Sequence, residues 1–502
     1  MPAKVYSAGV VGLDAQLIEV EADIASGLPK FLIVGLPDIA VQEARERVRS
    51  AIRNSLLRYP STRVTVNLAP ADIKKEGPAF DLPMAVSILA ASSQIPIIPP
   101  RSLFIGELSL EGRLRPVNGI LSVMLECQKK GWQRIFLPSS NATEASIIKD
   151  VKIYPVENLN QLINHLIGAG KISQYKAGPS VYQAPVFSVD FSQVKGQEQA
   201  KRALTIVAAG GHNALLSGPP GSGKTLLTKA LVSILPEMEL EEALDVTRIY
   251  SVAGLIQTDQ PLLRQRPFRS PHHTASAASL IGGGRIPRPG EISLAHRGVL
   301  FLDELPEFPR SVLESLRQPL EEGVIFVTRV QGSLKFPAKF ILMAAQNPCP
   351  CGYYGDRDKE CSCTPWQISK YNKKISGPLL DRIDLHLRVS RVKFEELTSI
   401  SPAEKSDSIR ERVVQARQVQ LKRFKNAKIF TNTEMDSRGI KMFCQIDTVS
   451  QEILHKAMSL HQLSARSYTR ILKVSRTIAD LEGSESIKSR HIAEALQYRA
   501  VD

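Results

Sequence analysis

The sequence predicts a multidomain α/β protein whose C-terminal part is helical. The chain has 502 residues, more than one hydrophobic core usually accommodates. Strand-like and helix-like segments alternate up to about residue 392, after which only helical periodicity is found. We therefore expect four parts: an N-terminal α/β domain (1–168), a linker (169–190), an α/β core (191–392) and a helical domain (393–502).

The composition is that of a globular protein with excess positive charge. Hydrophobic residues make up 43% of the chain, charged residues 23%, and the net charge is +14. This charge favours polyanionic partners such as nucleic acid, with a solvated basic surface as an equal alternative. The N-terminus lacks the pattern of a signal peptide, and the apolar stretch 82–98 is too interrupted to span a membrane. We expect a cytoplasmic protein with no membrane partner.

The N-terminal domain is predicted from short alternating elements. RVTVNLAP (63–70) and SLFIGELSL (102–110) are typical of strands, whereas residues 38–55 have helical periodicity. The segment 168–189 is rich in Gly, Pro, Ser and Gln, which favours a linker. In the C-terminal domain, four segments carry apolar residues three and four apart and predict helices: 406–425, 449–460, 465–483 and 486–500.

A phosphate-binding loop follows a strand-like segment of the core. GPPGSGKT fits G-x-x-x-x-G-K-[ST], with ALLS before it and a helical segment after it. Such a loop wraps phosphates with backbone N–H groups, while its lysine reaches the outer phosphates and its hydroxyl binds Mg²⁺. The predicted ATP-binding residues are Gly218, Pro219, Pro220, Gly221, Ser222, Gly223, Lys224 and Thr225.

Two further strand-like segments end in polar groups. The apolar run 299–302 precedes Asp303 and Glu304, which we expect to hold Mg²⁺ and to polarise the attacking water, respectively. The run 340–348 contains Asn347, which can orient water against the γ-phosphate; a turn-forming Asn before Pro is the alternative. In GPLLDRIDLHL, Arg382 is a candidate arginine finger, with a structural ion pair as the alternative.

Four of the six cysteines are clustered in NPCPCGYYGDRDKECSCTPW. Cys349, Cys351, Cys361 and Cys363 form two C-x-C pairs, and four thiolates suit tetrahedral Zn²⁺, although the pairs are closer than the common spacing. A redox-sensitive cluster or uncoordinated thiols are the alternatives. The intervening loop has little apolar surface, so metal coordination would supply folding free energy. It also carries two tyrosines suited to stacking on bases or packing on a neighbouring subunit.

These motifs, in this order, resemble the AAA+ superfamily. The stretch 266–308 is similar to its magnesium-chelatase-like branch, and the whole chain resembles the bacterial ComM/YifB family. The resemblance implies a P-loop AAA+ αβα core with a helical lid, and a homo-hexameric DNA helicase that promotes branch migration during natural transformation. Single-stranded or branched DNA is the implied partner, with recombination proteins as candidate additional partners. ATP sites would lie between subunits, with Arg382 acting in trans and Arg466 of the lid as the second sensor.

The resemblance also indicates where DNA binds. Residues 324–340 are typical of a hairpin, with Arg329 and Lys335 near its tip. In related helicases the equivalent hairpin points into the pore, where cationic side chains suit contacts with DNA phosphates. A charge-protected edge hairpin is the alternative. The glycine-rich insert SLIGGGRIPRPGEI, with Arg285 and Arg288, is a second candidate pore loop.

The N-terminal domain resembles the proteolytic domain of Lon, a ribosomal S5 domain 2-like fold, over residues 62–95 and 112–141. In that family a nucleophilic Ser follows a Gly-Pro pair and is activated by a Lys. Here Ala79 and Leu121 occupy these positions, so no activated nucleophile is expected. The domain is then a platform for subunit packing or for DNA.

We therefore predict an ATP-driven hexameric DNA motor that uses ATP, Mg²⁺ and a structural Zn²⁺. A chelatase-type motor that remodels a protein partner is one alternative, because the ATPase core fits it equally well. An ATP-gated DNA-binding scaffold is another, although a scaffold needs no complete hydrolytic set.

Overall fold

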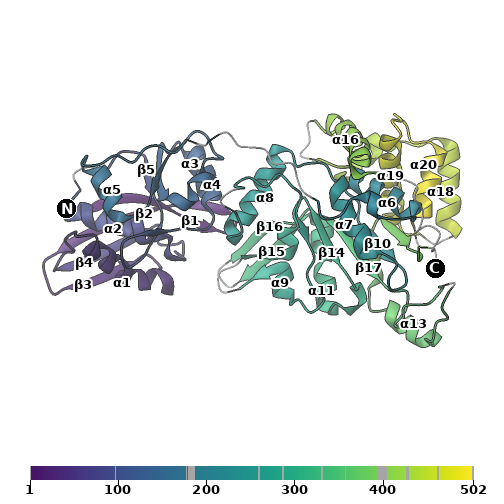
Figure 1. Cartoon of the computed structure of the whole chain (residues 1–502), viewed down its shortest axis with the longest axis horizontal. Helices are drawn as coiled ribbons and strands as arrows, with labels where there is room; N and C mark the ends of the chain where they lie inside the picture. The colour runs from purple at the N-terminus through teal and green to yellow at the C-terminus, as the bar shows by residue number, and fades with distance from the viewer. Residues whose placement is uncertain are drawn as a thin grey trace.

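The computed structural model describes residues 2–95, 98–176, 178, 187–257, 260–284, 288–329, 332–356, 358–392, 404–425, 429–460 and 463–499. Figure 1 shows an elongated molecule in which an N-terminal α/β part, a central α/β part and a C-terminal helical part follow one another. No helix in the described ranges is long and apolar enough to cross a membrane.

The N-terminal part is built on a mixed seven-stranded sheet of order β3-β4-β2-β1-β5-β8-β9. Its strands are β1 (Ala3–Val11), β2 (Asp14–Ala25), β3 (Lys30–Val34), β4 (Arg63–Ala69), β5 (Ser102–Phe104), β8 (Arg134–Pro138) and β9 (Lys152–Val156). Its helices are α1 (Ile39–Asn54), α2 (Asp81–Ala91), α3 (Ile120–Lys130), α4 (Ala142–Ala145) and α5 (Leu159–Leu166). Helix α1 begins where Asp38 Oδ1 accepts a hydrogen bond from Val41 N, as expected for an N-cap.

One strand prediction in this part was wrong. Residues 102–110 do not form a single strand: β5 ends at Phe104, and a short strand, β6 (Glu107–Leu108), pairs with β7 (Leu114–Arg115) instead. The break lies at Gly106, whose N–H donates to Ala79 O and whose carbonyl accepts from Leu82 N. The chain leaves the sheet because its backbone groups bond to the segment that begins α2.

The central part is a parallel five-stranded sheet of order β11-β14-β17-β10-β18. The strands are β10 (Ala214–Ser217), β11 (Phe268–Arg269), β14 (Val299–Leu302), β17 (Ile341–Gln346) and β18 (Leu385–Arg388). Alternate residues enter two different hydrophobic clusters, for example Leu216 in one and Leu215 in the other. Both faces are therefore buried, as is usual for parallel sheets.

Helices cover both faces of this sheet. The helices of this part are α6 (Glu198–Gly210), α7 (Lys224–Ile234), α8 (Leu240–Ala253), α9 (Ala277–Ile281), α10 (Glu291–Leu294), α11 (Arg310–Ser315), α12 (Arg317–Glu322), α13 (Pro365–Asn372) and α14 (Gly377–Leu380). Residues of α6 and α7 join the hydrophobic cluster on one face, and residues of α8 to α12 and of α14 join the cluster on the other. Two small ribbons are added, β12 (Gly282–Gly283) with β13 (Arg288–Pro289), and β15 (Val324–Arg329) with β16 (Gly332–Pro337). The second ribbon is the hairpin expected from the sequence.

The C-terminal part is helical, as expected. Its helices are α16 (Ser406–Arg423), α17 (Ser437–Phe443), α18 (Thr448–Leu460), α19 (Ala465–Leu481) and α20 (Ser489–Gln497). Its apolar residues Ile409, Ile471 and Ile492 belong to the same hydrophobic cluster as Leu216 and Phe301 of the central sheet. The helices therefore share a core with the central part and do not form a separate body.

The N-terminal and central parts meet through α8. Ser251 O accepts a hydrogen bond from Gly119 N at 3.1 Å, and Ser251 Oγ donates to Glu144. Arg248 pairs with Asp14 at the turn between β1 and β2. Leu13, in the same turn, is buried in the hydrophobic cluster of the central part, so this contact includes both polar and apolar groups.

Candidate ATP site and cysteine loop

The loop between β10 and α7 has the conformation expected of a phosphate-binding loop. Gly221 and Gly223 have φ of +76° and +84°, in the region that favours glycine. At Gly218 an added Cβ would lie 2.1 Å from Val389 O, so no side chain fits. Lys224 Nζ donates to Gly218 O at 2.7 Å and to Pro219 O at 2.9 Å, which holds the ammonium group over the loop.

The predicted polar groups of three strands meet at one edge of the sheet. Thr225 Oγ1 donates to Asp303 Oδ2 at 2.9 Å, and Lys224 Nζ donates to Asn347 Oδ1 at 3.3 Å. The contacts form because β17 lies between β10 and β14 in a parallel sheet, so the carboxyl ends of all three strands lie at one edge. Burial lowers the pKa of Lys224. A hydroxyl beside a carboxylate is a donor set that fits Mg²⁺.

Glu304 projects into solvent beside a histidine that our sequence reasoning did not single out. Its backbone is left-handed (φ +53°) and its side chain is 56% exposed. His273 Nδ1 lies 3.4 Å from Glu304 Oε2, and the His273 ring packs against His272. The adjacent histidines in SPHHTAS were the available sequence signal.

A cleft of 450 Å³ adjoins the phosphate-binding loop, a size within the range of ligand pockets. It is lined by Gln193, Val194, Lys195, Gln197, Pro220, Gly221, Ser222, Gly223, Leu226, Arg391 and Val392. Gln197 Nε2 donates to the carbonyls of Ser222 and Ser390, which ties the two sides of the cleft together. The segment before α6 and the segment after β18 thus supply a nucleotide-sized space beside the loop.

Arg382 and Arg466 meet at one carboxylate. The Arg382 side chain is 3% exposed and pairs with Glu321 of α12, and Arg466 Nη2 lies 3.2 Å from Glu321 Oε1. Among the described residues, neither arginine contacts the phosphate-binding loop of its own chain. The ion pair that the sequence left open for Arg382 is therefore present, and Glu321 is a second residue that sequence reasoning missed.

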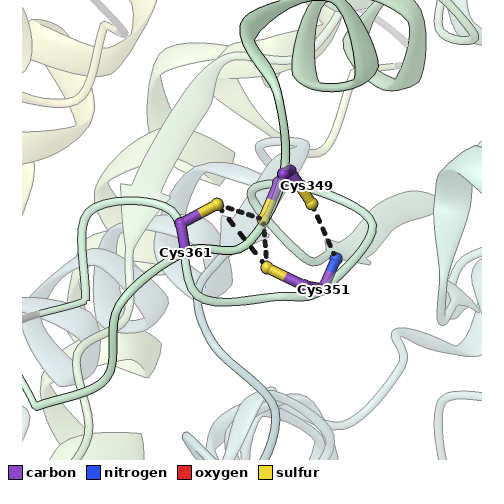
Figure 2. A group of neighbouring side chains, drawn as sticks. Cys349, Cys351 and Cys361 are labelled. Atoms are coloured by element: carbon purple, nitrogen blue, oxygen red, sulfur yellow. Dashed lines mark hydrogen bonds between the residues drawn. The ribbon is translucent and has the colours of Figure 1, made fainter.

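The four clustered cysteines converge as a metal site requires. Their sulfur atoms all lie within 4.8 Å of one another. The side chains of Cys349, Cys351 and Cys361 point toward one another (Figure 2), and their Sγ–Sγ distances are 3.4–3.6 Å. Four sulfurs at about 2.3 Å from Zn²⁺ would be about 3.8 Å apart, so the donor set fits that ion. The other two cysteines, Cys127 and Cys444, are free and buried away from this cluster.

The cysteine loop touches the ATP site. Gly352 lies against Pro220 of the phosphate-binding loop, and an added Cβ would be 2.6 Å from Pro220 Cδ. Arg391, which lines the cleft, pairs with Asp356 at 3.3 Å and lies over the ring of Tyr353. Three contacts therefore join the residues around the cleft to the residues around the cysteines.

The candidate DNA-binding residues are only partly within the described structure. Lys335 is exposed on β16, opposite Phe326, and Arg288 is exposed on β13. Arg285 and the side chain of Arg329 lie outside the described residues. In the N-terminal part, Leu121 belongs to an apolar cluster and Ala79 packs against it, so both residues that the Lon resemblance singled out have apolar surroundings.

Comparison with known proteins places this chain in a family. Three family models match: "Magnesium chelatase, subunit ChlI" over residues 190–397, "Subunit ChlI of Mg-chelatase" over 20–141, and "Magnesium chelatase, subunit ChlI C-terminal" over 403–499. The chain is 44% identical to Competence protein ComM of Haemophilus influenzae over 99% of its own length and 97% of the relative's. It is 43% identical to YifB of Escherichia coli, again over 99% and 97%.

More distant similarity covers single parts. The magnesium-chelatase 38 kDa subunit of Rhodobacter capsulatus is 26% identical over 47% of this chain and 69% of the relative. Lon protease 1 of Myxococcus xanthus is 23% identical over 34% of this chain and 22% of the relative. The full-length matches decide the assignment: the chain belongs to the ComM/YifB family of magnesium-chelatase-like AAA+ ATPases.

Proposed function

We propose that this protein is an ATP-driven hexameric DNA helicase that promotes branch migration during natural transformation. The observation that carries the proposal is the set of hydrolytic residues at one sheet edge: Lys224 bonds to Asn347, Thr225 bonds to Asp303, and Glu304 follows Asp303. The exposed hairpin cation Lys335, the net charge of +14 and the similarity to a competence protein support DNA as the substrate.

The residues at the sheet edge divide the work of ATP hydrolysis. The backbone of the phosphate-binding loop and Lys224 bind the phosphates, while Thr225 and Asp303 hold Mg²⁺, which would neutralise charge on the outer phosphates. Glu304 accepts a proton from the attacking water, and its exposed side chain leaves room for that water. Asn347, which accepts a hydrogen bond from Lys224, orients the attacking water against the γ-phosphate.

Arg382 and Arg466 act on the ATP of the neighbouring subunit. Both pair with Glu321, and among the described residues no hydrogen bond or ion pair joins either of them to the phosphate-binding loop of the same chain. In a ring, the triphosphate of the neighbour carries more negative charge than one carboxylate and competes with Glu321 for the two guanidinium groups. In this arrangement, residues 191–392 form the ATPase core and residues 393–502 form its lid. Residues 1–168 are a Lon-like platform, joined to the core by the linker 169–190.

The cysteine loop holds a structural Zn²⁺ and relays nucleotide state. Coordination by Cys349, Cys351, Cys361 and Cys363 would rigidify a loop that contacts the phosphate-binding loop through Gly352. The pore hairpin and the β12–β13 ribbon then grip DNA through Arg329, Lys335, Arg285 and Arg288, and this grip changes with the nucleotide. These contacts go to phosphates and are independent of sequence.

A second candidate is a motor that remodels a protein partner. It is favoured by the match of all three family models to a magnesium chelatase subunit. The two candidates share the ATP site and differ in what stimulates hydrolysis, so the stimulating ligand distinguishes them.

Strand displacement tests the proposal. Wild-type protein with ATP should displace strands from forked and four-way DNA, and DNA should stimulate ATP hydrolysis. Lys224→Ala and Glu304→Gln should abolish both. Glu307→Gln is the matched control, because Glu307 is a nearby exposed carboxylate that pairs with Lys374 outside the site. If DNA is neither displaced nor stimulatory while a protein partner stimulates hydrolysis, the helicase assignment is wrong.

A further inference from the structure

A row of exposed arginines lies on the outer face of α1. Arg45, Arg49 and Arg53, here called the α1 arginine row, are exposed and four residues apart, so they share one side of the helix. The opposite side is buried in the N-terminal core through Val41, Ala44, Val48, Ala51 and Ile52. The exposed Arg58 follows the helix. The row is therefore held on a rigid, well-packed element.

Within the described part of the chain, no carboxylate forms an ion pair with the row. Residues 45–63 hold six arginines and a single acid, Glu46. Throughout the described ranges, no ion pair involves a member of the row or Arg58, although Arg47 of the same helix pairs with Asp81 at 2.8 Å. The guanidinium groups of the row are therefore left without an ion-pair partner on an exposed helix face.

An aromatic ring positions two members of the row. The guanidinium groups of Arg49 and Arg53 lie 5.8 Å and 6.0 Å from the centroid of Tyr59, and the Tyr59 ring packs against Phe31. Burial raises the pKa of Tyr59 to about 12, so the phenol stays neutral and cancels none of the charge. A guanidinium over a ring keeps its N–H groups available for an anion.

We propose that the α1 arginine row is a DNA-backbone binding site on the N-terminal domain, separate from the pore hairpin. Arg45 and Arg53 are eight residues apart and so lie about 12 Å apart along the helix axis, a length over which one DNA strand presents three or four phosphates. The neighbouring polar side chains of Gln42 and Ser50 are of the types that, with arginine, contact phosphate oxygens of DNA. The choice of DNA as the polyanion rests on the proposed function.

Full-length protein and fluorescently labelled DNA test this site. Affinity for a 40-mer duplex and a single strand is measured by anisotropy between 0.1 and 0.3 M salt for Arg49→Gln/Arg53→Gln. The control is Lys129→Gln/Lys130→Gln, which removes the same charge from exposed residues of α3 in the same domain.

Loss of two phosphate contacts should lower the slope of log Kd against log salt concentration for the duplex by about 1.8, since each contact contributes about 0.9. The dissociation constant should then rise about 60-fold at 0.1 M salt and about 9-fold at 0.3 M. The control should stay near wild type.

Two results would overturn the proposal. One is wild-type affinity and salt slope in the arginine variant. The other is loss of ring assembly in that variant, measured by light scattering, which would make the row a subunit interface. The readout is binding without ATP, so it stays informative even if ATP-driven strand displacement fails and the proposed function falls.

Discussion

The contact between Gly352 and Pro220 yields a quantitative prediction for ATP binding. Replacing Gly352 by Ala places a methyl carbon 2.6 Å from Pro220 Cδ and 2.9 Å from Pro220 Cγ. Carbon atoms prefer separations of about 3.5–4.0 Å, so the methyl overlaps the proline ring by about 1 Å. The ring is part of the phosphate-binding loop, and relief of the overlap must move either that loop or the cysteine loop.

Gly355→Ala provides a matched control. Gly352 and Gly355 both have positive φ, +87° and +76°, so each alanine carries a similar backbone cost of about 1–2 kcal/mol. An alanine Cβ at Gly355 meets nothing within 4 Å. The difference between the two variants is therefore the overlap alone, for which overpacking costs of about 1–3 kcal/mol are typical.

The assay is titration of each variant with a fluorescent ATP analogue. If the overlap is relieved at the phosphate-binding loop, the Kd for ATP in Gly352→Ala should exceed that in Gly355→Ala by about 5- to 140-fold, because 1.4 kcal/mol corresponds to tenfold. Thermal unfolding of both variants checks that they are folded. Equal ATP affinities in two folded variants would refute the idea that the cysteine loop positions the phosphate-binding loop.

Three further predictions concern the metal, the paired arginines and acid stability. Cys361→Ser should reduce bound zinc from about one per chain to near zero in chelator-free protein; a retained zinc would contradict coordination by four cysteines. Glu321→Gln leaves the guanidinium of Arg382, 3% exposed, without its carboxylate. We expect the free energy of unfolding in urea to fall by about 1–3 kcal/mol, below the range for fully buried pairs because Glu321 is 40% exposed; an unchanged value would show that the pair does not stabilise the fold. Burial acts to raise the pKa of Asp190, but hydrogen bonds from Ser192 and Ser406 lower it to about 2. The ionised form is thus favoured in the folded state, so this carboxylate adds to the free energy of unfolding above pH 3.8, and the added stability is lost as the pH falls through 2. Asp190→Asn should therefore make the free energy of unfolding depend less on pH between 3.8 and 2. An unchanged pH dependence would show that Asp190 does not cause the loss of stability in acid.

Much of the ATP site could be predicted because its chemistry is local in sequence. Eight consecutive residues, 218–225, provide the phosphate-binding loop, and glycine spacing alone indicates its conformation. Asp303 and Asn347 were also predictable, because apolar runs that end in polar residues form parallel strands whose carboxyl ends share an edge. The contact of Thr225 with Asp303, 78 residues away, follows from this rule.

The cysteine cluster was predictable as a donor set. Two C-x-C pairs in fifteen residues indicate metal coordination by residue type and proximity, and the sulfur atoms do converge. Its surroundings were not predictable, since the approach of Gly352 to Pro220 depends on how a loop after β17 folds back over a loop after β10.

The sequence by itself thus determined the element types, the phosphate-binding loop and the metal-type ligands, because periodicity and short motifs act over a few residues. Only the tertiary structure decided that residues 102–110 break at Gly106, that His273 approaches Glu304, and that Arg382 and Arg466 share Glu321. Those contacts join residues that are far apart in the sequence and whose spacing follows no repeating pattern. They form because packing of the sheet and its helices brings particular side chains within reach, and no local pattern encodes that distance.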